Sequence, residues 1–137
     1  MNAKLIAYWI TTIFLALELL VGGITDLIHG KEVLIAGAPV VDIIVHLGYP
    51  VYLLIIIGIW KVLGSIAVVV PRCPRLKEWA YAGAFFEMTG AAASHIFRGD
   101  GPGVYAVPLV FAVLTLASWA LRPPSRVLGS ILSAHRN

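Results

Sequence analysis

The chain has 137 residues, of which 60% are apolar and only 12% are charged. A water-soluble domain needs more polar side chains than this to cover its surface, so the composition indicates a protein embedded in lipid. The length predicts a single domain over residues 1–137. The net charge of +3 comes without a basic cluster interleaved with aromatic residues, which argues against nucleic acid as a partner.

The chain has one cysteine, Cys73. A lone thiol cannot form a disulfide within the chain, nor can it carry out dithiol–disulfide chemistry. This argues against a quinone-linked disulfide oxidase or a vitamin K reductase, because paired cysteines carry the electrons in those enzymes.

Four apolar stretches are long enough to cross a bilayer, which takes roughly 20 residues in a helix. They span about residues 5–28, 51–70, 79–97 and 104–121. Pro50, Pro71 and Pro123 lie at their ends, where a missing N–H costs least. The first stretch is too long for a cleaved signal peptide and contains Glu18. The sequence therefore predicts an all-α fold, an integral membrane four-helix bundle.

The connection between the first two spans contains an apolar segment, Val40–Leu47, which predicts a short interfacial helix. Most of the cations that flank the spans lie on one side of the membrane if all four stretches cross it. They are Lys4, Arg72, Arg75, Lys77, Arg122, Arg126 and Arg136. The other side carries only Lys31 and Arg98. The positive-inside rule then places both termini in the cytoplasm, and predicts a multi-pass protein of the inner (plasma) membrane.

Two ionisable residues lie near the middle of their predicted spans. Lys61 lies roughly 15 Å into the second span, and Glu87 reaches nearly the same depth from the other side of the membrane. A charge in hydrocarbon is costly, so we expect these two side chains to form a pair. Glu18 would add a second carboxylate, and two carboxylates beside one ammonium favour a shared proton. A structural ion pair that fixes the helix register is the alternative interpretation.

Small and polar residues share a helix face with each of these charges, which predicts close helix packing around them. They are Thr11, Gly22 and Thr25 in the first span, Gly58 and Ser65 in the second, and Gly83, Gly90 and Ser94 in the third. The fourth span has only Thr115 and Ser118, and we expect it to form the wall of the bundle. His95 is expected near the outer boundary together with Asp26 and His46. His46 follows Asp42 by four residues, but no further ligands complete a metal site, so none is predicted.

Four segments resemble one membrane protein family. They are LKEWAYAGAFFEMTGAAASH from Leu76, HLGYPVY from His46, GIWKVLGSIAVVVPRCPRLKEWAYAG from Gly58, and GDGPGVYAVPLVF from Gly99. They are similar to the DoxX-like family over nearly the whole chain. The resemblance implies a four-helix membrane bundle with a lysine at the Lys61 position and an acid, usually aspartate, at the Glu87 position. Glutamate at Glu87 departs from that pattern, and an acid at Glu18 is less typical.

The resemblance also suggests what the protein does. The family takes its name from the membrane subunit of a thiosulfate:quinone oxidoreductase, and other relatives are linked to membrane redox complexes or to assembly of receptor channels. We therefore expect a membrane redox accessory that binds a quinone or another small lipophile, as a partner of a redox complex or as a homo-oligomer. The expected site comprises Glu18, Lys61, Glu87, His95, Ser94 and Trp60, with Phe85 and Phe86 beside it. The alternatives are a non-catalytic carrier or assembly factor, and an oligomeric proton-coupled transporter. No motif for haem, flavin or an iron–sulfur centre is present, and quinone is the candidate cofactor.

Overall fold

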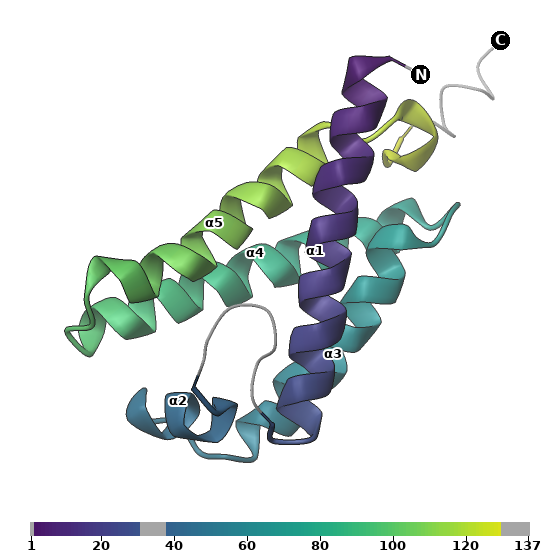
Figure 1. Ribbon diagram of the computed structural model, residues 1–137. Coiled ribbons are helices and arrows are strands. Elements are labelled where there is room, and N and C mark those ends of the chain that lie inside the picture. The colour runs from purple at the N-terminus through teal and green to yellow at the C-terminus, as the bar shows by residue number, and fades with distance from the viewer. Residues whose placement is uncertain (1, 31–37, 130–137) are drawn as a thin grey trace, which may run out of the picture.

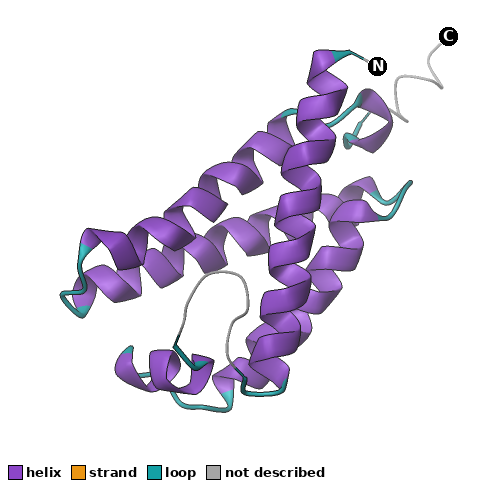
Figure 2. Ribbon diagram, viewed as in Figure 1, coloured by secondary structure: helices purple, strands orange, loops and turns teal. Residues whose placement is uncertain are grey.

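The computed structural model describes residues 2–30 and 38–129, and these residues are helical apart from short connections (Figures 1 and 2). The helices are α1 (Ala3–Leu27), α2 (Val40–His46), α3 (Leu53–Val69), α4 (Pro74–Phe97) and α5 (Pro102–Ala120), followed by a 3-10 turn over Pro124–Arg126. The short helix predicted within Val40–Leu47 is present as α2. Helix α4 begins earlier than predicted, because Pro74 fits the first turn, where a backbone N–H has no partner in the helix.

The four long helices form two pairs, α1 with α3 and α4 with α5 (Figure 1). The pairs meet where α1 begins and α5 ends, and they diverge toward the opposite end, where α2 lies. We call the first region, around Tyr8, Tyr81 and Ser118, the closed end. We call the second region, which comprises α2 and the α4–α5 turn, the open end.

Hydrogen bonds between side chains hold the closed end together. The Ser118 hydroxyl lies 2.7 Å from the Thr12 hydroxyl and 2.8 Å from the Tyr81 hydroxyl, so it links α5 to α1 and α4. All three residues are buried. Helix α5, expected as the wall of the bundle, is thus also bonded to two other helices, because buried hydroxyls need hydrogen-bond partners and Ser118 provides one to each.

Two of the cations at the closed end are buried and bonded. Lys77 is fully buried, and its ammonium donates to the carbonyl oxygens of Ala67 and Val68 at 2.9 and 2.8 Å. These carbonyl groups belong to the last turn of α3, where they have no partner within the helix. Lys77 therefore caps the C-terminus of α3. Arg122 donates to a carboxylate oxygen of Glu78 at 2.7 Å. Lys77 and Arg122, whose charges predicted the membrane topology, therefore also join helix ends.

Helices α1 and α3 approach each other closely at two glycines, Gly23 and Gly58. A Cβ atom on Gly23 would lie 2.8 Å from the Cβ of Lys61 and 2.9 Å from the carbonyl oxygen of Gly58. A Cβ on Gly58 would in turn lie 2.9 Å from the carbonyl oxygen of Gly23. Distances this short leave no room for a side chain, so backbone packs on backbone. The contact also fixes which residues of α1 lie opposite Lys61.

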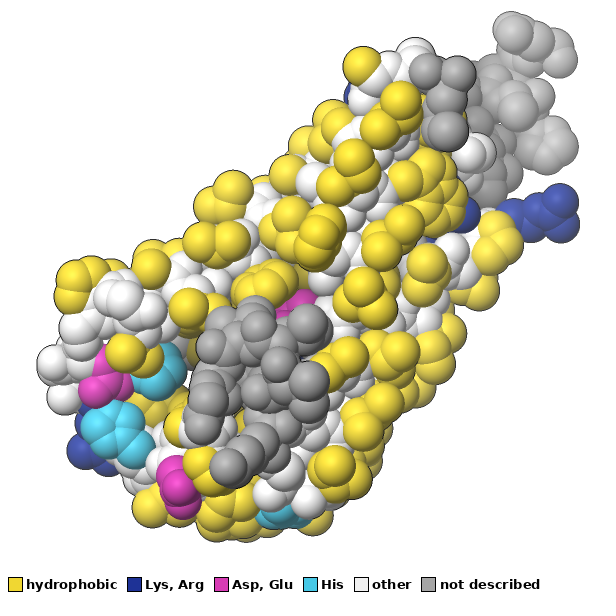
Figure 3. Space-filling view, in the orientation of Figure 1, with side chains coloured by type: hydrophobic (Ala, Val, Ile, Leu, Met, Phe, Trp, Pro, Cys, Tyr) yellow, Lys and Arg dark blue, Asp and Glu magenta, His cyan; other side chains and the backbone are white. Residues whose placement is uncertain are grey.

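The outer surface is that of a membrane protein. Helices α1 and α5 are long and apolar enough to cross a bilayer, and α3 is apolar but shorter, with 17 residues. Large hydrophobic side chains are exposed on all four long helices, among them Phe14, Ile59, Phe86 and Val113. Figure 3 shows hydrophobic side chains over most of one face, with basic groups at its ends. The predicted crossings by α3 and α4, and the orientation of the termini, remain predictions.

Candidate functional site

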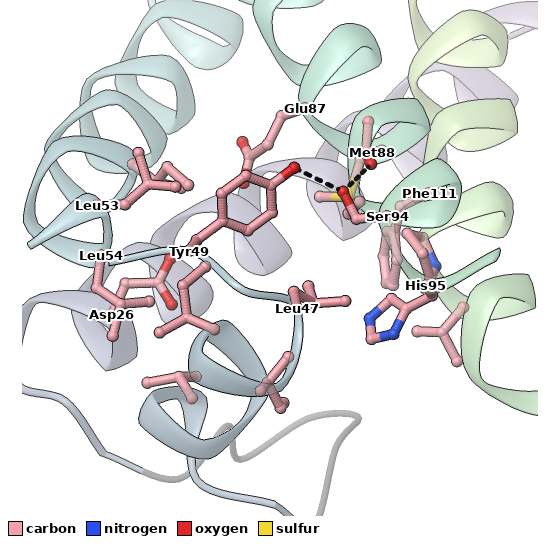
Figure 4. Close-up of a pocket in the computed structure, with 18 of the residues that line it drawn as sticks. Asp26, Leu47, Tyr49, Leu53, Leu54, Glu87, Met88, Ser94, His95 and Phe111 are labelled. Carbon is pink, nitrogen blue, oxygen red and sulfur yellow. Dashed lines mark hydrogen bonds between the residues drawn. The ribbon is translucent and has the colours of Figure 1, made fainter. Parts of the chain in front are cut away.

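The open end contains a cavity of about 730 Å³, with lining residues from all five described α-helices. A cavity of this size is typical of small-molecule sites, which measure roughly 300–1,000 Å³. Most of its lining is apolar and includes Leu54, Met88 and Phe111 (Figure 4). The polar and charged side chains on its wall are Glu18, Asp26, Tyr49, Lys61, Glu87, Ser94 and His95. A mostly apolar cavity with a few polar groups is the usual form of a ligand site.

Lys61 lies between two carboxylates on the wall of this cavity. Its Nζ atom is 3.4 Å from Oε1 of Glu87 and 3.1 Å from Oδ2 of Asp26. The contact predicted between Lys61 and Glu87 is therefore present. The side chains of Lys61 and Asp26 are 11% and 7% exposed, whereas that of Glu87 is 25% exposed. The cluster joins α1, α3 and α4 through charges that are largely shielded from the surroundings.

Asp26 was expected at the outer boundary and not beside Lys61. The Gly23–Gly58 contact explains the difference, because it places Gly23 against the Cβ of Lys61. Asp26 follows Gly23 by about one helical turn, on the same side of α1, within reach of the lysine side chain. The signal in the sequence was the spacing of four between Glu18, Gly22 and Asp26, which puts both acids on one helix face.

Glu18 also lines the cavity, and it is only 5% exposed. It precedes Gly23, so it lies deeper between the helix pairs, on the side of the closed end. The structure thus brings Glu18, Lys61 and Glu87 to one cavity. The Asp26 carboxylate of α1 contacts the Lys61 ammonium directly, at 3.1 Å.

Ser94 and His95 lie in α4 at the outer part of the cavity. The Tyr49 hydroxyl is 2.9 Å from the Ser94 hydroxyl, so the segment before α3 is bonded to α4 across the cavity (Figure 4). Nδ1 of His95 lies 2.6 Å from Oδ2 of Asp100. Nε2 of His46, at the end of α2, lies 2.8 Å from Oδ1 of the same carboxylate. Asp100, which the sequence did not single out, therefore ties α2 to α4.

Trp60 does not line this cavity. It is 68% exposed and lines a second hollow of about 520 Å³, the α3–α4 groove, which is bounded mainly by residues of α3 and α4. Lys61 and Glu87 line this groove as well as the cavity, so Trp60 shares a hollow with them, and its part in a ligand site stays a prediction. Ile57 and Lys61, which are four apart, face the cavity, and Trp60 faces outward. Phe86 lines the cavity, as expected.

Two glycines predicted to allow close helix packing instead border open space. Apart from its chain neighbours and the backbone of its own helix, a Cβ atom on Gly83 or on Gly90 would have no atom within 4 Å. Gly83 lines the α3–α4 groove, and Gly90 lines the cavity. Their lack of a side chain leaves space in these two hollows, whereas Gly23 and Gly58 bring helices together.

The family model of the DoxX-like family matches residues 10–118, from the first part of α1 to the end of α5. The chain belongs to the DoxX-like family. The match includes every residue of the Lys61 cluster and the cavity wall described above. No curated protein and no solved structure gives a significant match to the chain.

In this DoxX-like protein His46 pairs with Asp100 and not with Asp42, the neighbour that had suggested a metal site. Among residues 2–30 and 38–129, no three histidine, cysteine, aspartate or glutamate side chains are grouped so that they could hold a metal ion. The polar groups of the cavity are instead an ammonium, carboxylates, hydroxyls and an imidazole, which suit hydrogen bonding to an organic ligand.

The Asp100 contacts predict a pH dependence at the open end. Hydrogen bonds from His95 and His46 hold the pKa of the Asp100 carboxyl below its usual value. The stabilisation by this carboxylate should therefore be complete above the unfolded-state pKa of about 3.9 and should disappear as the pH falls through the lower folded-state value. We expect Asp100→Asn to lower the unfolding temperature at pH 6, and this difference from the wild type to shrink below about pH 4.

Circular dichroism of the detergent-solubilised protein across this range would measure the difference. Asp42→Asn is the matched control, because it removes an exposed carboxylate of α2. A difference for Asp100→Asn that stays constant from pH 6 to well below pH 4 would contradict the assignment.

Proposed function

We propose that this DoxX-like protein binds a small lipophilic molecule with a polar oxygen, a quinone in the first instance, in the cavity at its open end, as an accessory of a membrane redox system. The observation that carries the proposal is the position of Lys61, which lies on the wall of a mostly apolar cavity between the carboxylates of Asp26 and Glu87. An apolar cavity takes up a lipophile, and a few polar groups on its wall fix the orientation.

The chemistry of the Lys61 cluster suits a carbonyl ligand. An ammonium has three N–H donors, so Lys61 can donate one to a ligand oxygen while it keeps its two carboxylates. Glu87 is the more exposed of those two carboxylates, which makes it the better group to exchange a proton with the bound molecule. Glu18, on the same cavity wall, is the second candidate for that exchange.

The cost of these buried charges supports a functional role. A buried ion pair often contributes less stability than apolar side chains of similar size. Ionisable groups within membrane helices therefore commonly mark sites of function. Here a lysine and three acids line one cavity, although a single pair would suffice to fix the register of two helices.

We further propose that the chain crosses the inner membrane four times, with both termini in the cytoplasm. The start of α1 and the segment after α5 lie at the same end, where Arg126 contacts the Tyr8 hydroxyl at 3.3 Å. The α3–α4 connection lies at that end too, because Arg126 also donates to the carbonyl oxygen of Val69 at 3.0 Å. Four crossings would then place the cations of this end in the cytoplasm, as the positive-inside rule requires.

The proposal predicts that Glu87→Gln weakens quinone retention by roughly tenfold, since it replaces a charge-assisted partner of Lys61 by a neutral one. Native mass spectrometry of the purified protein, titrated with a short-chain benzoquinone, would measure the bound fraction. Glu78→Gln is the matched control, because it neutralises an acid of the same helix that bonds Arg122 at the closed end. Equal retention by wild type and Glu87→Gln would count against the proposal.

A non-catalytic assembly factor is the second candidate, and one observation favours it. The Lys61 cluster joins α1, α3 and α4, as a purely structural link would. In that case the wild-type protein should bind no quinone in the same titration, and Glu87→Gln should lower only the unfolding temperature. Capture of a defined membrane partner by cross-linking would then identify the role.

A further inference from the structure

Resting on the proposed function, we infer that the ligand is a two-part molecule, with a polar head in the cavity and a long apolar chain in the α3–α4 groove. The proposal thus names the ligand class as chain-bearing lipophiles, in preference to small free molecules that would fill the cavity alone. It follows from the composition of the two hollows, from the residues that they share, and from the open space at Gly83 and Gly90.

The two hollows differ in chemistry. The cavity at the open end has hydroxyl, carboxylate, ammonium and imidazole groups on its wall. Among the described residues that line the α3–α4 groove, the charged ones are Lys61 and Glu87, which it shares with the cavity. Its remaining lining is apolar and includes Leu63, Ile66 and Leu76. Such a surface suits a hydrocarbon chain, because the chain makes van der Waals contacts along it and leaves no polar group of the groove without a partner.

The two hollows meet at the Lys61 cluster. Ile57, Lys61 and Glu87 line both of them. A head group that accepts a hydrogen bond from Lys61 in the cavity is therefore next to the inner part of the groove. In the proposed binding mode, a substituent on that head passes Ile57 and continues along α3 and α4. One molecule can thus occupy both hollows while its polar atoms stay beside the ammonium.

The groove also borders the predicted lipid. Trp60 and Trp79 line it and are 68% and 77% exposed, and Ile66 beside them is 55% exposed. In a membrane these side chains would face acyl chains, so an apolar chain in the groove exchanges one hydrocarbon environment for another. Such a chain need not enter water on its way to the site. This favours a ligand dissolved in the bilayer over one delivered from solution.

Two glycines allow the hollows to be filled one at a time. Gly83 lies in the groove and Gly90 in the cavity, and a Cβ at either position meets no atom within 4 Å. The Cβ of a substituted residue therefore displaces no neighbour at either position, and we expect the rest of a leucine side chain to extend into the hollow. Gly64 provides a second groove variant, because a Cβ there would lie 3.8 Å from Cδ1 of Leu19, an ordinary contact distance.

The experiment compares two probes, a methyl-substituted benzoquinone and a benzoquinone with a decyl chain, on the purified full chain in nanodiscs. We expect the wild type to bind the decyl compound more tightly. Gly83→Leu and Gly64→Leu should weaken decylquinone binding by about tenfold and leave methylquinone binding within about twofold, since only the chain loses its packing contacts. Gly90→Leu should weaken both, because it fills the space for the head.

The outcomes separate this inference from the proposed function. If methylquinone binds and both groove variants keep the wild-type ratio of the two affinities, the groove does not hold the chain and the inference is overturned. If the wild type binds neither quinone, the proposed function itself fails. The unfolding temperature of each variant shows whether it is folded, and the two groove variants must agree for the inference to stand.

Discussion

Lys61→Met is expected to destabilise the protein by about 3–5 kcal/mol, the usual cost of removing one partner from a buried ion pair. The substitution keeps the length of the side chain but removes the cation that Asp26 and Glu87 share. The carboxylates of Asp26 and Glu87 would then lie close together without the ammonium between them. Uptake of a proton by one of them would relieve only part of their repulsion. Thermal unfolding in detergent at pH 7, followed by circular dichroism, would measure the loss.

The matched control neutralises the carboxylates as well. In the triple variant Asp26→Asn/Lys61→Met/Glu87→Gln no charge remains in the cluster, so most of the lost stability should return. Comparing Lys61→Met with the triple variant separates the effect of the lost ion pairs from the effect of the lost packing of the lysine side chain. An unfolding temperature of Lys61→Met that equals that of the wild type would show that these contacts do not hold the helices together.

Gly23→Ala is the second substitution with a large expected effect. The added methyl group would lie 2.8 Å from the Cβ of Lys61 and 2.9 Å from the carbonyl oxygen of Gly58, so α1 and α3 must move apart. Overpacking of this kind costs about 1–3 kcal/mol. The shift also displaces Lys61 from Asp26, so we expect the variant to retain less ligand as well as to unfold at a lower temperature.

Gly83→Ala is the control for Gly23→Ala, because it makes the same change in a helix where the new Cβ meets no atom within 4 Å. It should be neutral, or stabilising by the difference in helix propensity of up to about 1 kcal/mol. If Gly23→Ala and Gly83→Ala unfold at the same temperature, the close approach of α1 and α3 does not exist as described.

Depth along a span predicted one contact of the site and missed another. Counting residues from the helix ends put Lys61 and Glu87 at the same level, and their contact is present at 3.4 Å. The same counting placed Asp26 too far out, since it ignored where the helices cross. That crossing depends on the Gly23–Gly58 contact, which is a property of two helices together. A sequence pattern within one helix shows which residues share a face of that helix. It does not show which residues of a neighbouring helix lie at the same level.

Residues far apart in the chain account for the other differences. Ser118 belongs to a buried cluster only because Thr12 and Tyr81 come from two other helices. Asp100 is a short-loop acid whose role depends on His46, which lies 54 residues away. Helix periodicity does distinguish Lys61 from Trp60, and stricter use of it would have placed Trp60 on the outer surface. The apolar runs predicted the helices, whereas the position of the cavity depends on how the helix pairs diverge.

The most direct test of the Lys61 site uses the neutral triple variant, Asp26→Asn/Lys61→Met/Glu87→Gln, once its unfolding temperature shows that it is folded. Native mass spectrometry would compare how much methyl-substituted benzoquinone it retains with how much the wild type retains, under identical conditions. We expect the wild type to show the protein–quinone mass and the triple variant to show protein alone. Equal retention by the two would show that the lysine and its carboxylates do not hold the ligand.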